Sequence, residues 1–268
     1  VGLEGTELVS APVVIDSRQV SDHGCFVAIV GENVDGHDYA PAAYNSTKGL
    51  VIISSKDLDV PHIRVQDTVD ALGKIAYSYL REIRQYREAN GLPFDVAGVT
   101  GSVGKTTTKD LTRQIFASQG PTVAPQASFN NEIGLPLTIL EADNDTRYLL
   151  LEMGASGPGH IAYLTDIAPL DVAAVLMVGH AHMGGFGSVE AVARAKSEII
   201  QGLRSSGVAI LNADDPRTMA MAELAPGPVF SFSPSGEPAN VRADDVVIGP
   251  DGRASFTART AGASAPVQ

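Results

Sequence analysis

The feature that most constrains this chain is a glycine-rich turn between a short apolar run and a helical segment. The run Asp95 to Val99 predicts a buried strand, the turn is Gly101-Ser102-Val103-Gly104-Lys105-Thr106-Thr107, and a helix is expected from Thr106 to Ser118. Glycines let the backbone amides face phosphate groups, the lysine reaches terminal phosphates, and the next hydroxyl can ligate Mg2+. The general pattern has glycine where this chain has Val99, but the strand, turn and helix together predict a nucleotide-binding loop.

Downstream of this turn, apolar runs alternate with helical segments. We expect strands at about 148–153, 172–178 and 208–211, a helix at about 189–203, and a hairpin within 246–257. Near-continuous apolar strands separated by helices are typical of a mostly parallel sheet covered on both faces. The predicted fold class is therefore α/β, with ligands at the carboxyl ends of the strands.

The part of the chain before the turn has a different pattern of apolar and turn residues. Residues 1 to about 66 alternate short β-rich runs with Gly, Asp and Asn turns, which predicts a small α/β domain. Apolar positions from Thr68 to Glu88 recur at three- and four-residue steps, as in an amphipathic helix. We expect one domain over 1–66 and a central domain over 67–268, incomplete at its C-terminal end.

Charge and cysteine content exclude several classes of function. The 268 residues carry 19 Lys and Arg against 31 Asp and Glu, a net charge of −12 that repels nucleic-acid backbones. The single cysteine, Cys25, cannot form an intrachain disulfide, which favours a cytoplasmic location. No apolar run approaches the ~20 residues of a membrane span, so no membrane insertion is expected.

Two polar side chains follow predicted strands at the ligand-binding edge. Glu152 ends the run that begins at Tyr148, and His182 follows the run Val172 to Val178. A carboxylate and an imidazole at one edge suit a divalent ion beside the phosphate loop. The spacing alone leaves open that they are two loop residues that never meet.

Lys196 lies within the apolar stripe of the predicted helix at 189–203, four residues after Val192 and three before Ile199. It should therefore point inward, and burial lowers a lysine pKa toward the neutral amine. A neutral amine can add CO2 to form a carbamate, which could hold a metal ion. The alternative is a lysine whose stem covers apolar surface while its ammonium reaches water.

Several segments together resemble the Mur ligases, and within that family the members that add D-alanyl-D-alanine. In the N-terminal part they are Ile15-Asp16-Ser17-Arg18, Gly24-Cys25-Phe26-Val27-Ala28 and Asp35-Gly36-His37-Asp38. In the central part they are Thr100–Lys109, Phe129–Gly134, Glu152-Met153-Gly154-Ala155, Ala195-Lys196-Ser197-Glu198 and Leu211-Asn212-Ala213-Asp214. Turn chemistry alone assigns no role to the asparagines in these segments, because asparagine is a common turn residue.

The resemblance implies an ATP-dependent, ADP-forming ligase of peptidoglycan precursor synthesis. ATP would phosphorylate the carboxyl end of UDP-MurNAc-tripeptide, and the amine of D-Ala-D-Ala would displace phosphate to form an amide. Such phosphoryl transfer needs chiefly positioning and neutralisation of crowded negative charge. These small-molecule substrates are the only partners expected, and the protein is expected to be a monomer.

The resemblance also assigns residues. It implies contacts to the UDP-sugar substrate from Ser17, Arg18, Asp35 and His37. It implies contacts to ATP from Gly101, Ser102, Val103, Gly104, Lys105, Thr106, Thr107, Asn131 and Asn212. It implies Mg2+ ligands at Thr106, Glu152, His182 and a carbamylated Lys196, and catalytic roles for Lys105, Lys196 and His182.

The chain also departs from the pattern of the family. Met177, His180 and Gly185 are unusual around His182. The family's C-terminal domain is not present, so we expect these residues to bind nucleotide without turnover. Three alternatives stay open: a sister ligase that adds another amino acid, a non-catalytic nucleotide-binding regulatory module, and another phosphate-loop hydrolase or kinase.

Overall fold

The computed structural model describes residues 8–125, 127–179 and 186–268. The chain divides into two compact units. Unit 1 is Val1–Leu92 with Glu132–Asp145, and unit 2 is Pro93–Asn131 with Thr146–Gln268. The border expected between residues 66 and 67 does not coincide with the limits of these units, because the long helix that follows it belongs to unit 1.

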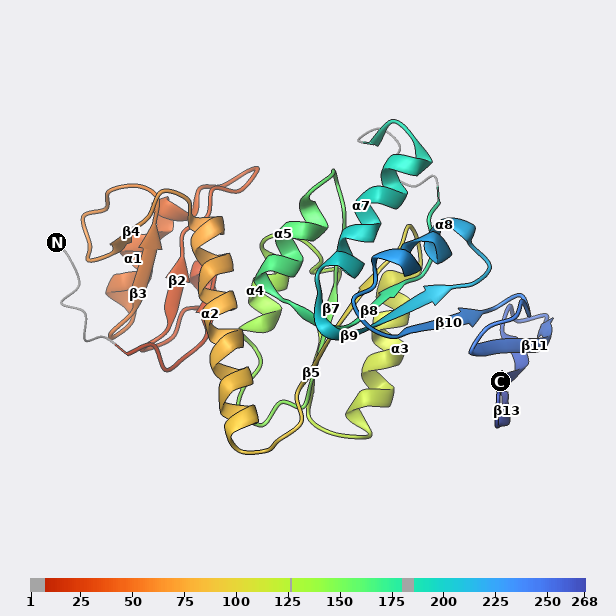
Figure 1. The fold of residues 1–268 in the computed structure, drawn as a ribbon. Helices are drawn as coiled ribbons and strands as arrows, with labels where there is room; N and C mark the ends of the chain where they lie inside the picture. The colour runs from red at the N-terminus through yellow and green to blue at the C-terminus, as the bar shows by residue number, and fades with distance from the viewer. Residues whose placement is uncertain (1–7, 126, 180–185) are drawn as a thin grey trace. The chain divides into compact units, whose positions relative to one another are not determined.

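Unit 1 is built on a four-stranded sheet whose strands are all parallel (Figure 1). In sheet order the strands are β1 Val13–Val14, β2 Cys25–Val27, β3 Val51–Ser54 and β4 Ile63–Arg64. Its helices are η1 Ser17–Gln19, η2 Gly36–Tyr39, α1 Ala40–Ser46, α2 Thr68–Ala89 and α4 Gly134–Ile139. The helix expected at 68–88 is therefore confirmed as α2.

Alternation along β2 and β3 explains the packing of unit 1. Phe26 and Ile52 lie in a buried cluster that includes Ala43 of α1. Their neighbours Val27 and Ile53 point to the other face, in a cluster that includes residues of α2 and α4. Successive side chains of a strand alternate between faces, so short all-apolar strands predict a sheet covered on both sides.

Unit 2 contains a nine-stranded sheet that is parallel from β6 to β11 and antiparallel from β11 to β13. In sheet order its strands are β13 Ser264–Val267, β12 Ala254–Thr260, β11 Val241–Ile248, β10 Val229–Ser233, β9 Leu203–Asn212, β8 Leu170–Val175, β5 Asp95–Thr100, β7 Tyr148–Glu152 and β6 Thr122–Val123. The helices are α3 Lys105–Ala117, α5 His160–Ile167, α7 Val189–Gln201, α8 Pro216–Met219 and η3 Ala220–Leu224.

Helices cover both faces of this sheet. On β5, Ala97 lies in a cluster with Phe116 of α3, whereas a Cβ on the adjacent Gly98 would lie 3.4 Å from Ile199 of α7. The parallel register pairs Val99 with Glu152, so β5 and β7 end at the same level. The predicted α/β class with a mostly parallel sheet is confirmed, and its carboxyl edge carries the loops described below.

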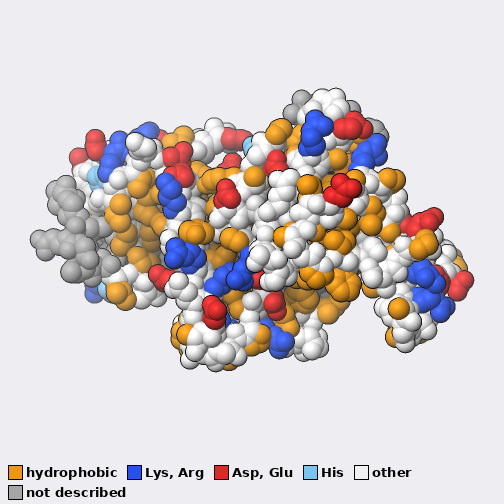
Figure 2. Space-filling model, viewed as in Figure 1, with side chains coloured by type: hydrophobic (Ala, Val, Ile, Leu, Met, Phe, Trp, Pro, Cys, Tyr) orange, Lys and Arg blue, Asp and Glu red, His pale blue; other side chains and the backbone are white. Residues whose placement is uncertain are grey.

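The surface of the described residues is mixed in character. On the face shown in Figure 2, Lys and Arg side chains are interspersed with Asp and Glu side chains. Among the described residues, no helix combines the length and the apolar character that crossing a bilayer requires.

Candidate nucleotide site

The glycine-rich turn joins β5 to α3 at the carboxyl edge of the unit 2 sheet. Gly104 caps α3 with a φ of 83°, a left-handed conformation that glycine adopts without strain. A Cβ at Gly101 would lie 2.9 Å from the Cβ of Leu176, so the loop leaves no room for a side chain there. Lys105 Nζ donates to the Gly101 carbonyl at 2.9 Å and lies over the loop. A curled backbone with an ammonium group above it fits a polyphosphate.

Ser102 holds this loop against the segment that follows β8. Its backbone N–H donates to the Met177 carbonyl at 3.0 Å, and its hydroxyl accepts from the N–H of Gly179 at 2.8 Å. Ser102 is buried, whereas Val103 and Thr107 are exposed. Ser102 therefore anchors the loop to the segment after β8, while Val103 and Thr107 face solvent.

A carboxylate and three polar side chains form a network at the start of α3. The hydroxyl of Thr106 donates to Glu152 Oε2 at 2.9 Å and lies 3.1 Å from Ser128 Oγ. Asn130 Nδ2 donates to the other oxygen, Glu152 Oε1, at 2.8 Å. Glu152 is buried, so both its oxygens are held in fixed positions. The neighbouring Asn131 is exposed, and its predicted contact with ATP stays a prediction.

Thr106 and Glu152 are therefore brought together as the sequence predicted. A hydroxyl and a carboxylate are oxygen ligands of the kind that Mg2+ accepts, beside a loop suited to phosphates. His182 lies outside the described residues, as do His180 and Gly185. Within the described part of the chain, no three His, Cys, Asp or Glu side chains come together as a metal site.

Lys196 lies on α7 with 5 % of its surface exposed. Burial lowers the pKa of Lys196 to about 8, and the positive charge of Lys105 acts in the same direction. The inward orientation of the side chain expected from the apolar stripe is thus what the structure shows.

The loop after β9 uses its polar side chains within the protein. Asn212 Nδ2 donates to the Leu176 carbonyl at 2.8 Å, and its Oδ1 accepts from the N–H of Asp214 at 2.9 Å. Asp215 Oδ2 accepts from the N–H of Val178 at 2.7 Å. These bonds tie the end of β9 to the segment after β8, next to the phosphate loop. Asn212 is 8 % exposed, so its predicted contact with ATP stays a prediction.

In unit 1, Asp35 and His37 lie in one internal network. His37 Nε2 accepts from the N–H of Ser55 at 3.0 Å, which places the ring proton on Nδ1, 2.5 Å from Asp35 Oδ1. The other carboxylate oxygen of Asp35 bonds to the Lys56 ammonium. That ammonium and His37 hold the pKa of Asp35 well below its usual range. Because His37 is buried and both its ring nitrogens are bonded, it organises this loop.

The predicted residues Ser17 and Arg18 form η1 beside β1. Asp16 caps this short helix by accepting from the N–H of Arg18 at 3.0 Å, and its carboxylate also bonds the guanidinium group. The Arg18 guanidinium lowers the pKa of Asp16 to about 2. The side chain of Arg18 is 87 % exposed, so its charge is accessible to a ligand.

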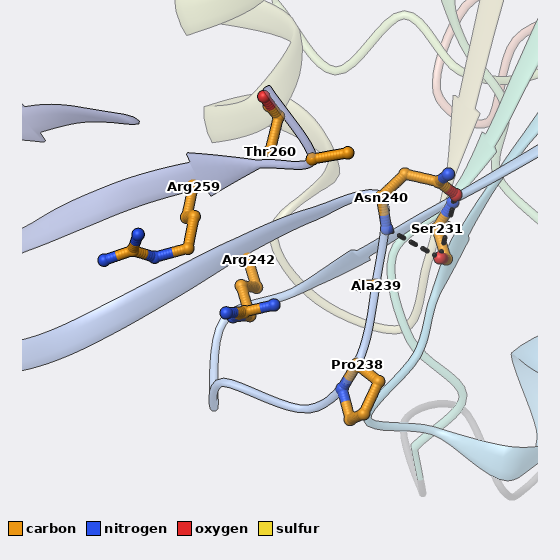
Figure 3. Close-up of a pocket in the computed structure, with 8 residues that line it drawn as sticks. Ser231, Pro238, Ala239, Asn240, Arg242, Arg259 and Thr260 are labelled. Atoms are coloured by element: carbon orange, nitrogen blue, oxygen red, sulfur yellow. Dashed lines mark hydrogen bonds between the residues drawn. The ribbon is translucent and has the colours of Figure 1, made fainter. Parts of the chain in front are cut away.

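A separate hollow of about 640 Å³ lies in unit 2 among β10, β11 and β12 (Figure 3). Arg242 and Arg259 line it and are cross-strand partners. Their Nε atoms donate to the two oxygens of Asp244, at 2.9 and 2.5 Å, which lowers the pKa of that carboxyl. The hollow contains no residue predicted for the site, and its positive charge is partly neutralised by Asp244.

Sequence reasoning missed several residues that support the site. Ser128 and Asn130 are among them, as are Lys109, buried on α3, and Glu198, whose carboxylate accepts from Gly159 N at 2.7 Å. Asn130 and Glu198 stand in the segments singled out above, so adjacency to a predicted residue was the available signal. No periodic pattern indicates a loop residue such as Ser128.

Comparison with known proteins agrees with this geometry. Residues 99–267 match the family described as "Mur ligase middle domain", and residues 11–79 match "Mur ligase family, catalytic domain". A UDP-N-acetylmuramoyl-tripeptide--D-alanyl-D-alanine ligase of Mycobacterium leprae is 39 % identical over 267 residues. That alignment covers 90 % of this chain and 50 % of the relative, so the chain spans about half the length of that protein.

Solved structures give the same result. The crystal structure of MurF from Acinetobacter baumannii has a TM-score of 0.85 at 31 % identity, covering 96 % of this chain and 54 % of that one. MurF ligase from Thermotoga maritima in complex with ADP has a TM-score of 0.82 at 30 % identity, covering 97 % of this chain and 58 % of that one. With a family match over residues 99–267 and a phosphate loop in place, this chain belongs to the Mur ligase family.

Proposed function

We propose that this chain supplies the nucleotide-binding and UDP-sugar-binding parts of a ligase that joins D-Ala-D-Ala to UDP-MurNAc-tripeptide. The observation that carries the proposal is the phosphate loop with the Thr106–Glu152 pair at its helix end and the buried Lys196 nearby. The similarity to the UDP-N-acetylmuramoyl-tripeptide--D-alanyl-D-alanine ligase of Mycobacterium leprae supports the choice of substrates. The proposed reaction consumes ATP and releases ADP and phosphate.

The residues of the phosphate loop would bind and orient the polyphosphate. The backbone of Gly101–Thr107 would donate its amides, and Lys105 would exchange the Gly101 carbonyl for a terminal phosphate oxygen. Thr106 and Glu152 would hold Mg2+, with His182 and a carbamylated Lys196 as the further proposed ligands. Bound Mg2+ supplies neutralisation of negative charge where phosphates and carboxylate meet.

Lys196 suits carbamylation for a chemical reason. With a pKa of about 8, about a tenth of its amine is neutral at pH 7, far more than for an ordinary lysine, and only the neutral amine attacks CO2. The new N–C bond gives a carbamate and releases one proton. The product is an anion. The positive charge of Lys105, which disfavours the ammonium form of Lys196, would stabilise the carbamate.

Unit 1 would bind the UDP-sugar substrate. Arg18 is exposed and suited to an anionic group, and Ser17 lies beside it. Asp35 and His37 would act by holding the loop around Ser55 rather than by direct contact through His37, whose ring nitrogens are already bonded. The predicted monomeric state and cytoplasmic location stay predictions.

The test is phosphate release from ATP by the longest form of the protein that contains these residues. The assay contains UDP-MurNAc-tripeptide and compares D-Ala-D-Ala with single amino acids, with Lys196→Ala in parallel. The proposal predicts release that requires D-Ala-D-Ala and is lost in the variant. Release with another amine indicates a sister ligase, and nucleotide binding without release under any amine indicates a non-catalytic module.

A further inference from the structure

Lys109 is a fully buried lysine that the proposed reaction does not use. It lies on α3, one helical turn after Lys105, and its exposed fraction is 0 %. Its Nζ donates to the Pro125 carbonyl at 2.6 Å and lies 2.7 Å from Asp110 Oδ1. The acidic partner is half exposed, so the bond to Pro125 is the contact that reaches into the interior.

An ammonium group in this position is costly compared with an apolar side chain. Burial removes it from water, and that cost is offset only by well-placed hydrogen bonds and ion pairs. A methionine has a similar length and could fill the space between α3 and the loop. Unlike methionine, Lys109 also donates a directional hydrogen bond to one carbonyl, that of Pro125.

That carbonyl stands at the start of the loop that completes the candidate Mg2+ site. Three residues on, Ser128 Oγ lies 3.1 Å from the hydroxyl of Thr106. Two residues further, Asn130 Nδ2 donates to Glu152 Oε1 at 2.8 Å, and its carbonyl accepts from Gly154 N at 2.8 Å. The loop is thus bonded to the site at its far end, and Lys109 holds its near end.

We propose that Lys109 is a positioning residue for the Mg2+ site. By holding Pro125 it fixes the loop, so that Ser128 and Asn130 keep the Thr106 hydroxyl and the Glu152 carboxylate in their orientations. Lys109 touches neither nucleotide nor metal in this account. The inference rests on the proposed function, because it concerns the metal that accompanies ATP.

The test compares Lys109→Met with Lys74→Met, which makes the same substitution at a lysine 75 % exposed on α2. Binding of a fluorescent ATP analogue is titrated with Mg2+ and repeated in EDTA. Because residues that orient metal ligands affect metal affinity by about 10–100-fold, we expect Lys109→Met to raise the Mg2+ concentration for half-maximal binding at least about tenfold. Binding in EDTA stays unchanged in Lys109→Met, and Lys74→Met matches the wild type throughout.

A double-mutant cycle separates positioning from simple packing. Asn130→Ala should shift the Mg2+ dependence as Lys109→Met does, and the two together should shift it by less than the product of the single effects, because they act through one loop. Lys109→Gln, which keeps a donor, should recover part of the loss. If Lys109→Met fails to fold, the Lys109→Gln and Asn130→Ala pair carries the same comparison.

The outcomes distinguish this inference from the proposed function. Wild-type binding of Mg2+-ATP with an unchanged Mg2+ dependence in Lys109→Met and Lys109→Gln overturns the positioning role alone. The inference is also overturned if Lys109→Met loses the same factor in nucleotide affinity with and without Mg2+. It is overturned as well if the shift in Mg2+ dependence of the double variant equals the product of the shifts of the Lys109 and Asn130 single variants. Absence of Mg2+-ATP binding by the wild type removes the proposed function, and the inference with it.

Discussion

At the scale of single residues, the site depends on groups whose chemistry is changed by their neighbours. Burial and the charge of Lys105 lower the pKa of Lys196 to about 8. Glu152 is buried with each carboxylate oxygen accepting a hydrogen bond, one from Thr106 and one from Asn130. These environments convert an ordinary lysine and an ordinary glutamate into candidates for carbamylation and metal binding.

The lowered pKa of Lys196 predicts a pH-dependent stability. In the unfolded chain a lysine titrates near pH 10.4, so below about pH 8 it is protonated in both states and the cost of burying its charge is fully present. Between about pH 8 and 10.4 only the unfolded state is protonated, so stability rises with pH by up to about 3 kcal/mol.

This rise is measured as the difference in unfolding free energy between wild type and Lys196→Met, by urea denaturation in CO2-free buffer. Lys74→Met serves as the exposed control and should show no such difference from the wild type. If the difference in unfolding free energy between wild type and Lys196→Met does not change between pH 8 and pH 10, the lowered pKa is contradicted.

Carbamylation of Lys196 gives a second prediction. In 13C-labelled bicarbonate near pH 8, the wild type should show one carbamate carbon signal in its NMR spectrum that Lys196→Met lacks and Lys74→Met keeps. The amine is reactive there because about half of it is neutral at its pKa. A spectrum without the signal, or with the signal in Lys196→Met, contradicts the assignment.

Thr106 gives a third prediction, because its hydroxyl is the group placed for Mg2+. Thr106→Val keeps the shape of the side chain and removes that oxygen, so Mg2+-dependent ATP binding should weaken by about ten- to a hundredfold. Thr257→Val on β12 is the matched control and should bind as the wild type does. Calorimetric titration with and without Mg2+ measures the difference, and equal affinities for Thr106→Val and wild type would exclude the ligand role.

At the scale of elements, α7 links two parts of the site. It carries Lys196, and two residues later Glu198 accepts from the backbone N–H groups of Gly159 and Ala162, at 2.7 and 3.0 Å. These bonds cap the first turn of α5 and satisfy donors that a helix N-terminus leaves without partners. Glu198 therefore fixes the segment that follows Glu152 on the chain.

Removing this cap should destabilise unit 2. Glu198→Ala leaves two helix N–H groups without their charged acceptor, and we expect a loss of about 1.5–3 kcal/mol in unfolding free energy. Glu190→Ala on the same helix is the control, since its contact with Arg217 is 3.6 Å long and exposed. Urea denaturation measures both variants, and equal stabilities would show that the cap contributes nothing.

The sequence predicts those elements in which a regular spacing of apolar residues, or a glycine-rich turn, extends over many residues. The helix α2, the β5–loop–α3 unit and α7 have apolar spacing or glycine turns over a dozen residues or more, and they form as expected. The helix α4 has only 6 residues and the strand β13 has only 4, and no pattern in the sequence predicts either of them. Such short elements exist because they pack on others, and a local pattern does not reveal that.

The same limit applies inside α3. Leu111 and Ile115 would be assigned to the core by hydropathy, yet they are 58 and 65 % exposed, while Lys109 is buried. The buried side of this helix combines both kinds of contact, because Phe116 packs on the cluster of Ala97 and Lys109 donates to the Pro125 carbonyl. The contact of Asn130 with Glu152 could not be predicted for a similar reason, because loop side chains follow no regular period.

At the scale of the whole molecule, unit 1 is discontinuous in sequence. Residues 132–145 leave unit 2 and return α4 to unit 1, where Ile133, Leu137 and Leu140 pack on the cluster of Cys25 and Leu72. The candidate nucleotide residues lie in unit 2 and the candidate UDP-sugar residues lie in unit 1. The chain passes between the two units at three points, so each unit is made of two separate stretches of sequence.

This topology predicts that a fragment ending at Leu92 is unstable. It lacks three aliphatic side chains that pack on its core, and partial burial of each contributes about 1 kcal/mol or more. We expect poorly dispersed NMR signals from residues 1–92, and recovery of native-like dispersion when α4 is supplied as a peptide of residues 132–145. A well-dispersed spectrum from the fragment alone would contradict the role of α4.

The phosphate loop of this chain is proposed to bind ATP together with Mg2+. The most direct measurement is calorimetric titration of residues 1–268 with ATP in Mg2+, in Mg2+-free buffer, and with Lys105→Ala. We predict binding that strengthens with Mg2+ and is lost or weakened at least about tenfold when the Lys105 ammonium is removed. No binding by the wild type, or binding indifferent to both Mg2+ and Lys105, would contradict the account.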